Sequence, residues 1–183
     1  MVRIAVTTAV LGASLAAACT GPAINQATLD LIGEFEGFIP DVYNDPTGNP
    51  TVGYGHLCQQ AGCAEVPYAI PLSEEDGKKL LADDVIGFQD CIATDTAQGV
   101  TLNANQYGAL VSWAYNVGCG NSGGSSLIAR LNAGEDPATV IAEELPLWNQ
   151  SGGVVLPGLE RRRAAEVDLA NTATEDPALP AAC

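Results

Sequence analysis

The chain has 183 residues, of which 47% are hydrophobic, so it is long enough to bury the core of one domain. Its formal net charge is −15 at pH 7, with 22 acidic residues against 7 lysines and arginines. A surface this acidic repels phosphate backbones, which excludes nucleic acid as a partner.

The chain begins with a signal-like segment. Arg3 is followed by a mostly apolar run over residues 4–18 that ends in small residues. This pattern predicts a signal peptide over residues 1–18 and one exported, extracellular domain over residues 19–183. The run is shorter than the roughly 20 residues that span a bilayer, so we expect no stable membrane association. Two alternatives remain open: a lipoprotein signal that ends before Cys19, and a signal-anchor-release helix.

A helical pattern then leads to the first candidate for chemistry. Apolar residues at Leu29, Ile32 and Phe35 recur at helical spacing, and Gly37 is a natural helix stop. The pattern predicts a helix that ends with Glu36. An acid at a helix end is well placed to face whatever element follows.

The following residues predict a β-hairpin. Turn-forming residues gather between positions 44 and 49, and a β-branched and aromatic alternation resumes at Thr51. Asp45 then lies in or beside the turn. Hydrolysis of a glycosidic bond needs one carboxylic acid to protonate the leaving oxygen and a second carboxylate to attack or to activate water. Glu36 and Asp45 are candidates for that pair, although most acidic side chains in such a chain are solvated surface.

The spacing EG-x5-Y-x-D-x2-G-x2-T-x-G-x-GH over residues 36–56 resembles the active-site hairpin of phage-type lysozymes, glycoside hydrolase family 24. The downstream segments NQYGALVSWAYNVGCG, SSLIARLNAGE and PGLERRRAAE resemble the helical domain of that family. The resemblance covers residues 24–170. It is similar above all to secreted fungal members.

The resemblance implies an α+β, two-lobed lysozyme-like fold, with a small hairpin lobe, a helical lobe over residues 73–171 and a substrate groove between them. It makes Glu36, Asp45 and Thr51 the catalytic triad, with Glu36 as the general acid. It also implies that Asn116 hydrogen-bonds the glycan. An ordinary strand threonine is the plain alternative for Thr51.

In the same family an arginine of the last helix reaches the catalytic glutamate. Here Arg161, Arg162 and Arg163 are consecutive, which leaves open the register of that contact. Three such residues are usually a solvated helix face, paired with neighbouring acids such as Glu166.

The rest of the chain predicts a helical domain. Residues 57–71 are expected to form a loop, and residues 118–124 are expected to break the chain. Ser73 and Thr101 are expected to cap helices, and Pro137 and Pro157 occupy positions where a first helical turn tolerates proline. The expected helices cover residues 73–92, 101–117, 125–132, 137–148 and 157–170.

Six cysteines suit an exported protein with disulfides. Cys58 and Cys63 flank a short loop that contains glycine and are expected to pair, and Cys91 can then pair with Cys119. Cys19 and Cys183 remain as a bridge between the chain ends. Alternatively, Cys19 leaves with the signal and Cys183 stays free.

Three further residues invite functional interpretations. His56 is the only histidine, and its place after a strand favours a structural hydrogen-bonding role over a chemical one. Without a second histidine a metal site is not expected. Trp113 and Trp148 could stack on sugar rings, but at helical spacing we expect them in the core.

The resemblance therefore implies a secreted, antibacterial muramidase. Its partner is bacterial peptidoglycan, in which it hydrolyses the β-1,4 bond between N-acetylmuramic acid and N-acetylglucosamine with inversion, as a monomer without a cofactor. Two alternatives stay open. A lytic transglycosylase needs Glu36 but can dispense with Asp45, and a non-catalytic glycan-binding module on the same fold needs neither.

Overall fold

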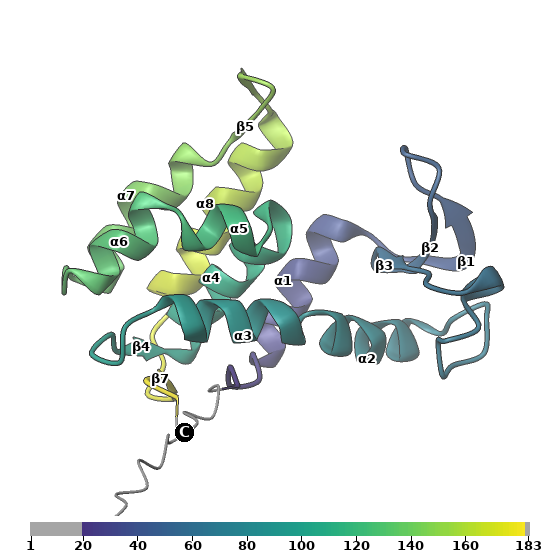
Figure 1. Cartoon of the computed structure of the whole chain (residues 1–183), viewed down its shortest axis with the longest axis horizontal. Helices are drawn as coiled ribbons and strands as arrows, with labels where there is room; N and C mark the ends of the chain where they lie inside the picture. The colour runs from purple at the N-terminus through teal and green to yellow at the C-terminus, as the bar shows by residue number, and fades with distance from the viewer. Residues whose placement is uncertain (1–19, 182–183) are drawn as a thin grey trace, which may run out of the picture.

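One helix joins two lobes in the computed structural model, which describes residues 20–181 (Figure 1). This helix, α1 (Gln26–Glu36), starts after Asn25, whose side chain accepts a hydrogen bond from the backbone amide of Thr28. It ends at Gly37, where a φ of 73° turns the chain away. Glu36 is thus the last helical residue, as predicted.

The hairpin lobe is a three-stranded antiparallel sheet in the order β1-β2-β3. Its elements are β1 (Ile39–Asn44), β2 (Pro50–Gly53), β3 (His56–Leu57) and the 3-10 helix η1 (Ala61–Cys63). Tyr43 of β1 pairs with Thr51 of β2, and Val52 pairs with His56 of β3. The predicted hairpin is confirmed, and β3 adds a short third strand.

The helical lobe holds the remaining elements, and Figure 1 shows α2 leading from the hairpin lobe into α3. They are α2 (Glu74–Asp84), α3 (Ile86–Asp95), β4 (Leu102–Asn103), α4 (Ala104–Val117), α5 (Cys119–Gly123), α6 (Ser126–Asn132), α7 (Pro137–Glu144), η2 (Leu145–Leu147), β5 (Gln150–Ser151), β6 (Val154–Val155), α8 (Pro157–Asn171) and β7 (Pro177–Leu179). The short strands β4 and β7 pair with each other, as do β5 and β6.

The single helix predicted over residues 73–92 is wrong, because it is interrupted at Val85, which separates α2 from α3. Ser73 does cap the start, where its hydroxyl accepts a hydrogen bond from the amide of Asp76. Leu81, Val85 and Ile92 are all buried, so the apolar stripe runs through the bend. Periodicity alone therefore gave no sign of the break.

Thr101 does not cap α4, contrary to prediction. Asn103 is the cap, and it forms a capping box with Gln106. The residues before it are extended because Leu102 pairs with Leu179 of β7. Residues 118–124 were expected to break the chain, but they include the short helix α5. The helix predicted over residues 137–148 changes to 3-10 geometry at Leu145, one residue before Pro146.

The central helix of the larger lobe is α4, as predicted. Most of its residues, including Tyr107, Leu110 and Trp113, are buried, and it packs against α1, α3, α5, α7 and α8. Gly108 lets α1 approach closely, since a Cβ atom there would collide with the side chain of Thr28. A separate small core, built from Val52, Leu72, Leu80 and their neighbours, supports the hairpin lobe.

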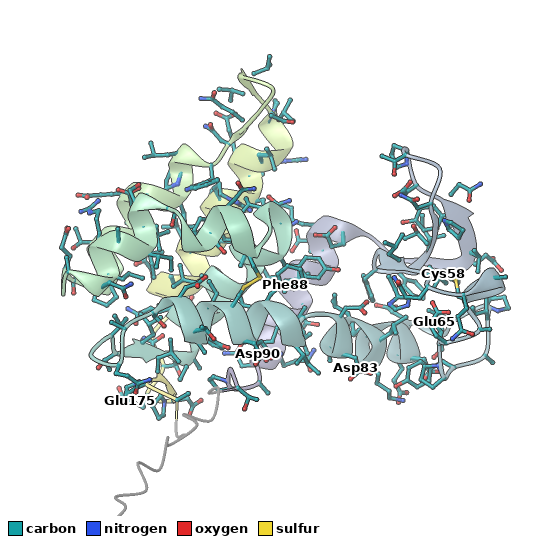
Figure 2. All side chains as sticks on the ribbon, in the orientation of Figure 1. Cys58, Glu65, Asp83, Phe88, Asp90 and Glu175 are labelled. Atoms are coloured by element: carbon teal, nitrogen blue, oxygen red, sulfur yellow. A yellow bond between two sulfur atoms is a disulfide. The ribbon has the colours of Figure 1, made fainter. Side chains whose placement is uncertain are left out.

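Two predicted disulfides are present. Cys58 is bonded to Cys63 within the hairpin lobe, and Cys91 of α3 is bonded to Cys119 of α5 in the helical lobe. Figure 2 places Cys58 and Glu65 in the smaller lobe and Phe88 and Asp90 on α3.

The predicted partners Cys19 and Cys183 lie outside the described residues, as does the expected signal over residues 1–18. Between residues 20 and 181, none of the helices combines the length and the apolar character that a membrane span requires.

Candidate active site

Glu36 meets an arginine of the last long helix. Nη1 of Arg162 lies 2.6 Å from Oε1 of Glu36, and the side chain of Glu36 keeps 26% of its exposure. Arg162 also lies over the ring of Phe35, 5.7 Å from its centroid. The middle arginine of the triplet is therefore the one that reaches the glutamate.

The two carboxyl oxygens of Glu36 differ in their surroundings. Oε1 accepts the hydrogen bond from Arg162, whereas Oε2 has no hydrogen-bond partner among residues 20–181. A pocket of about 540 Å³ lies beside this carboxyl, between the end of α1 and the start of α8. Its lining includes Glu36, Asn116, Leu156, Arg161 and Arg162. One carboxyl oxygen is thus fixed, and the other is available to a ligand.

Arg162 is held by a buried polar cluster. Its Nε lies 3.2 Å from Oε1 of Glu166, and its Nη2 donates to the backbone carbonyl of Ser112. The Ser112 hydroxyl and Arg163 Nη2 donate to the same Glu166 oxygen, at 2.8 and 2.9 Å. Arg162, Arg163 and Glu166 are all buried. We expected these residues to form a solvated helix face. That expectation is wrong for Arg162, Arg163 and Glu166, and Arg161 is the only exposed residue of these four.

Burial sets the ionisation of this cluster. Burial raises the pKa of Glu166, against the opposing charges of Arg163 and Arg162. Burial also lowers the pKa of Arg163 to about 10. Nε of Arg163 lies 2.8 Å from Oε2 of Glu166, but the angle is too poor for a hydrogen bond, so this contact is an ion pair only.

Asp45 lies in the hairpin turn and organises it. Its Oδ1 accepts hydrogen bonds from the backbone amides of Thr47 and Asn49 and from the Thr47 hydroxyl. The Asn49 amide and the Thr47 side chain are the main reasons why the pKa of Asp45 falls to about 2. Asp45 is therefore a carboxylate at any pH near neutrality.

Thr51 is buried at the start of β2, and its hydroxyl donates to the backbone carbonyl of Asn49 at 3.0 Å. Asn49 thus connects Asp45 and Thr51, since its amide donates to the first and its carbonyl accepts from the second. Within residues 20–181, no hydrogen bond joins Glu36 directly to either residue. The fold therefore brings Asp45 and Thr51 together in the hairpin lobe. Glu36 lies at the end of α1, the helix that joins the two lobes.

Tyr115 of α4 lies close enough to Glu36 to be affected by its charge, and its hydroxyl donates to the backbone carbonyl of Tyr54 at 3.5 Å. Burial, followed by the charge of Glu36, raises the pKa of Tyr115, so its hydroxyl stays protonated. Its ring packs edge-on against Phe88, with centroids 5.0 Å apart. Sequence reasoning did not single out this residue, because an aromatic side chain at helical spacing resembles ordinary core.

His56 makes hydrogen bonds of the predicted structural kind. Its Nδ1 lies 2.8 Å from Oδ1 of Asp84, and its Nε2 lies 3.4 Å from Oε1 of Glu65. Glu65 in turn accepts hydrogen bonds from the amides of Gln59 and Gln60. His56 therefore ties β3 to α2 and to the disulfide loop.

Asn116 is exposed at the end of α4, and its side-chain oxygen accepts a hydrogen bond from Arg163. It lines the Glu36 pocket and also a second hollow of about 400 Å³, whose walls include Trp148 and Gln150. Trp113 is fully buried, and Trp148 packs edge-on against it, with centroids 5.2 Å apart. The prediction that both tryptophans lie in the core is confirmed for Trp113. Trp148 is partly exposed and also lines the second hollow.

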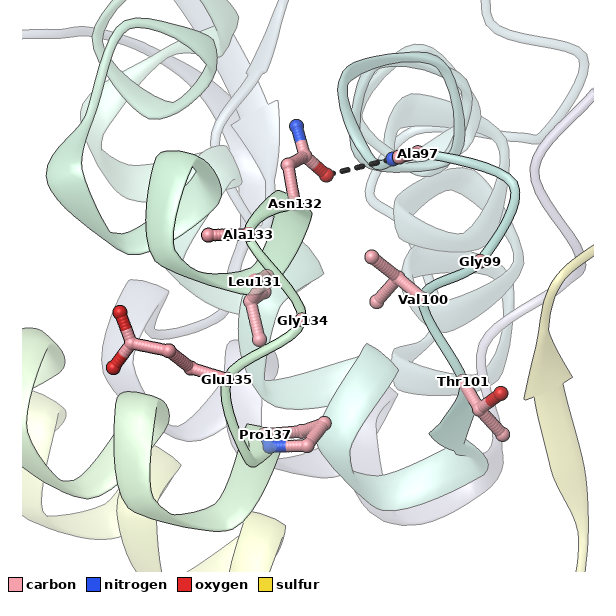
Figure 3. A pocket seen from close by; sticks show the side chains of 10 residues that line it. All are labelled: Ala97, Gly99, Val100, Thr101, Leu131, Asn132, Ala133, Gly134, Glu135 and Pro137. Atoms are coloured by element: carbon pink, nitrogen blue, oxygen red, sulfur yellow. Dashed lines mark hydrogen bonds between the residues drawn. The ribbon is translucent and has the colours of Figure 1, made fainter.

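A third hollow, of about 350 Å³, lies away from these residues on the helical lobe (Figure 3). Asn132 ties its two sides together, since its side chain accepts a hydrogen bond from Ala97 N and donates to Asp95 O. Its lining contains Glu135 as the single acid, and that carboxylate is paired with Arg130. This hollow lacks the carboxyl pair that glycoside chemistry needs.

No group of three His, Cys, Asp or Glu side chains within residues 20–181 is placed to hold a metal ion. Besides Tyr115, sequence reasoning missed Ser112, the buried position of Glu166, and Asn49 as the link between Asp45 and Thr51. The spacing of Glu166 from Arg162 and Arg163, at i,i+4 and i,i+3, was visible in the sequence. It resembles the spacing of surface ion pairs.

Comparison with known proteins gives consistent matches. Residues 33–166 match the family described as Phage lysozyme. An endolysin of Bacillus phage PZA is 40% identical over 153 residues, which are 82% of this chain and 56% of that protein. The chain therefore spans about half the length of that relative. A protein of Bacteriophage PS119 named SAR-endolysin is 31% identical over 161 residues, 85% of this chain and 91% of its own length.

A solved structure shows the same fold. The muramidase domain of SpmX from Asticaccaulis excentricus superposes with a TM-score of 0.66 and 29% sequence identity. The match covers 82% of this chain and 98% of that domain. The α+β, lysozyme-like architecture expected from the sequence is confirmed.

Proposed function

The chain belongs to the phage lysozyme family, and we propose that it is a muramidase that hydrolyses the β-1,4 bond between N-acetylmuramic acid and N-acetylglucosamine in bacterial peptidoglycan. The observation that carries the proposal is the carboxyl of Glu36. Arg162 holds one of its oxygens, and the other borders a pocket of about 540 Å³ without a protein partner among residues 20–181. A general acid needs this arrangement, in which position is fixed while one oxygen can carry the proton to the leaving group.

Asp45 and Thr51 are proposed to act on water. Asp45 stays ionised because hydrogen bonds hold its pKa at about 2, and Asn49 links it to the Thr51 hydroxyl. A carboxylate and a hydroxyl on the hairpin side could orient a water molecule opposite the leaving group, which inverts the anomeric centre. Inversion of a β-linkage predicts that the new reducing end forms first as the α-anomer. Proton NMR of early products tests this, and a β-anomer would show retention.

Analysis of digestion products separates the candidate reactions. Purified peptidoglycan is incubated with the protein, and the soluble products are identified by mass spectrometry. A hydrolase yields reducing muramic acid ends, a lytic transglycosylase yields anhydromuramic ends, and a glycan-binding module yields no products. The ionised Asp45 favours hydrolysis, since a transglycosylase uses a hydroxyl of the substrate in place of activated water.

We also propose that the protein is exported and acts outside the cell as an antibacterial monomer without a cofactor. The support is the apolar run after Arg3 and the pair of disulfides, which persist in oxidising compartments. The alternative is a signal-anchor-release helix, which the name SAR-endolysin of the PS119 relative suggests. N-terminal sequencing of the protein from culture medium and from membranes tells these apart. The expected similarity to secreted fungal members is not supported, because the relatives described above come from phages.

A further inference from the structure

The charges of the described residues leave one cation unpaired. Of the seven lysines and arginines, Arg3 lies outside residues 20–181 and six are described. Lys78, Lys79, Arg130, Arg162 and Arg163 each make at least one ion pair with a carboxylate. Arg161 makes no ion pair, hydrogen bond or ring contact with any described residue. In a chain of net charge −15, an arginine without an acidic partner is unusual.

The position of Arg161 is equally specific. It lines the same pocket as Glu36 and Arg162. Successive residues of a helix point about 100° apart. Arg162 and Arg163 are therefore directed into the protein, where they are buried, while Arg161 is exposed. Among residues 20–181, the one lysine or arginine that makes no ion pair with a carboxylate thus lies at the wall of the candidate active site.

We propose that Arg161 binds a carboxylate of the stem peptide that the muramic acid carries, which makes it a substrate-specificity residue. This inference rests on the proposed muramidase function. In peptidoglycan the peptide is attached to the muramic acid sugar, so its carboxylates lie near the bond that is cut. A guanidinium carries five N–H donors in a planar fork that matches a carboxylate. The acetamido and hydroxyl groups of the glycan need no such charge.

The negative charge of the rest of the protein explains why a single arginine can affect substrate binding. A protein of net charge −15 repels an anionic wall at long range, because the summed charge sets the potential that an approaching ligand meets. Arg161 offers a local attraction at the pocket, and its side chain breaks no internal ion pair when it turns to a ligand. It should therefore select peptide-bearing glycan over bare glycan.

The test compares Arg161→Gln with wild type in the full chain on two substrates, glycan strands with intact stem peptides and strands stripped of peptides by an amidase. We expect KM for the peptide-bearing strands to rise about two- to fivefold, as for loss of an exposed ion pair, with kcat unchanged. KM for the stripped strands should not change. Arg161→Lys should restore part of the affinity. Lys79→Gln is the matched control, since it removes one exposed positive charge on α2, outside the pocket.

A binding experiment separates this inference from the proposed function. The dissociation constant of a soluble disaccharide-peptide is measured, beside that of the same compound with its carboxylates amidated. Arg161→Gln should weaken the first and leave the second unchanged, whether or not the protein turns substrate over. Equal losses for both ligands, or an equal loss in Lys79→Gln, would overturn the role of Arg161. A third outcome would also overturn it. If Arg161→Gln lost activity only on cell walls that retain phosphate polymers, the site would bind phosphate and not a peptide carboxylate.

Discussion

Arg162 Nη1 lies 2.6 Å from Glu36 Oε1, although the two residues are 126 positions apart in the chain. The contact joins the end of α1 to α8, and Arg162 is itself fixed by Glu166 and the carbonyl of Ser112. Since proton transfer requires a donor within hydrogen-bond reach of its target, a side chain held in this way is pre-positioned for general acid catalysis.

Replacing Glu36 with glutamine should abolish most turnover while preserving the fold. Glutamine keeps the shape and an oxygen that can accept from Arg162, but it cannot donate a proton to a leaving group. General acid–base catalysis contributes about 10²- to 10⁴-fold, so a loss of that order is expected on purified peptidoglycan. Glu34→Gln, an exposed position on the same helix, should retain activity. Wild-type turnover in Glu36→Gln would refute its assignment as the acid.

Replacing Arg162 with alanine should destabilise the protein strongly. Its side chain is 5% exposed, and its removal leaves Glu166, which is fully buried, with one cation fewer. Breaking a buried pair in this way costs about 3–5 kcal/mol in the free energy of unfolding. Arg161→Ala on the preceding position should change that free energy by less than about 0.5 kcal/mol, because the exposed side chain makes no ion pair, hydrogen bond or ring contact with residues 20–181. Urea unfolding measures both, and equal effects would contradict the structure.

Asp45→Asn should change how stability depends on pH. The pKa of Asp45 is about 2 in the folded protein, below the roughly 3.9 of an unfolded aspartate. A group with a lowered folded pKa contributes stability above its unfolded pKa and loses it as pH falls through the folded value. The Tm difference between wild type and Asp45→Asn should therefore shrink between about pH 4 and pH 2. Thermal unfolding across this range gives the answer, and a constant difference would rule out the proposed pKa.

Salt should assist lysis of whole bacteria at pH 7 and matter little near pH 4. At neutral pH the net charge of −15 repels anionic walls, and ions at 0.15 M screen charges over about 8 Å. Protonation of surface carboxylates at acidic pH removes much of the repulsion, so we expect an acidic optimum. Lysis rates across ionic strength at both pH values test this, with an uncharged oligosaccharide as the control. Inhibition by salt at pH 7 would contradict the repulsion argument.

The sequence predicted the parts of the site that are local. The helix that ends at Glu36, the turn at Asp45 and the strand at Thr51 follow from apolar spacing and turn residues within one short segment. The Cys58–Cys63 disulfide followed from a short loop in the same way, and it left Cys91 free to pair with Cys119. These features are fixed by neighbours in the chain, so periodicity and residue type suffice to find them.

The parts that escaped prediction depend on packing between distant elements. Which of three arginines reaches Glu36 is set by the rotation of α8 against α4, and that rotation is fixed by which side chains the lobe buries. Glu166 resembled a surface acid because charged residues are seldom fully buried. The helix break at Val85 also escaped prediction, since the buried apolar stripe continues across it.

The long separation between Glu36 and Arg162 also has a meaning for biosynthesis. The ribosome adds about 5–20 residues per second, so the acid precedes its arginine by about 6 to 25 s. For most of that time the growing chain holds the complete hairpin motif but cannot fix the carboxyl, because α8 has not been made. A chain that stops before residue 162 would carry every residue of the motif and still lack the ordered acid. The cell that makes the protein therefore meets an ordered acid only after α8 has been translated.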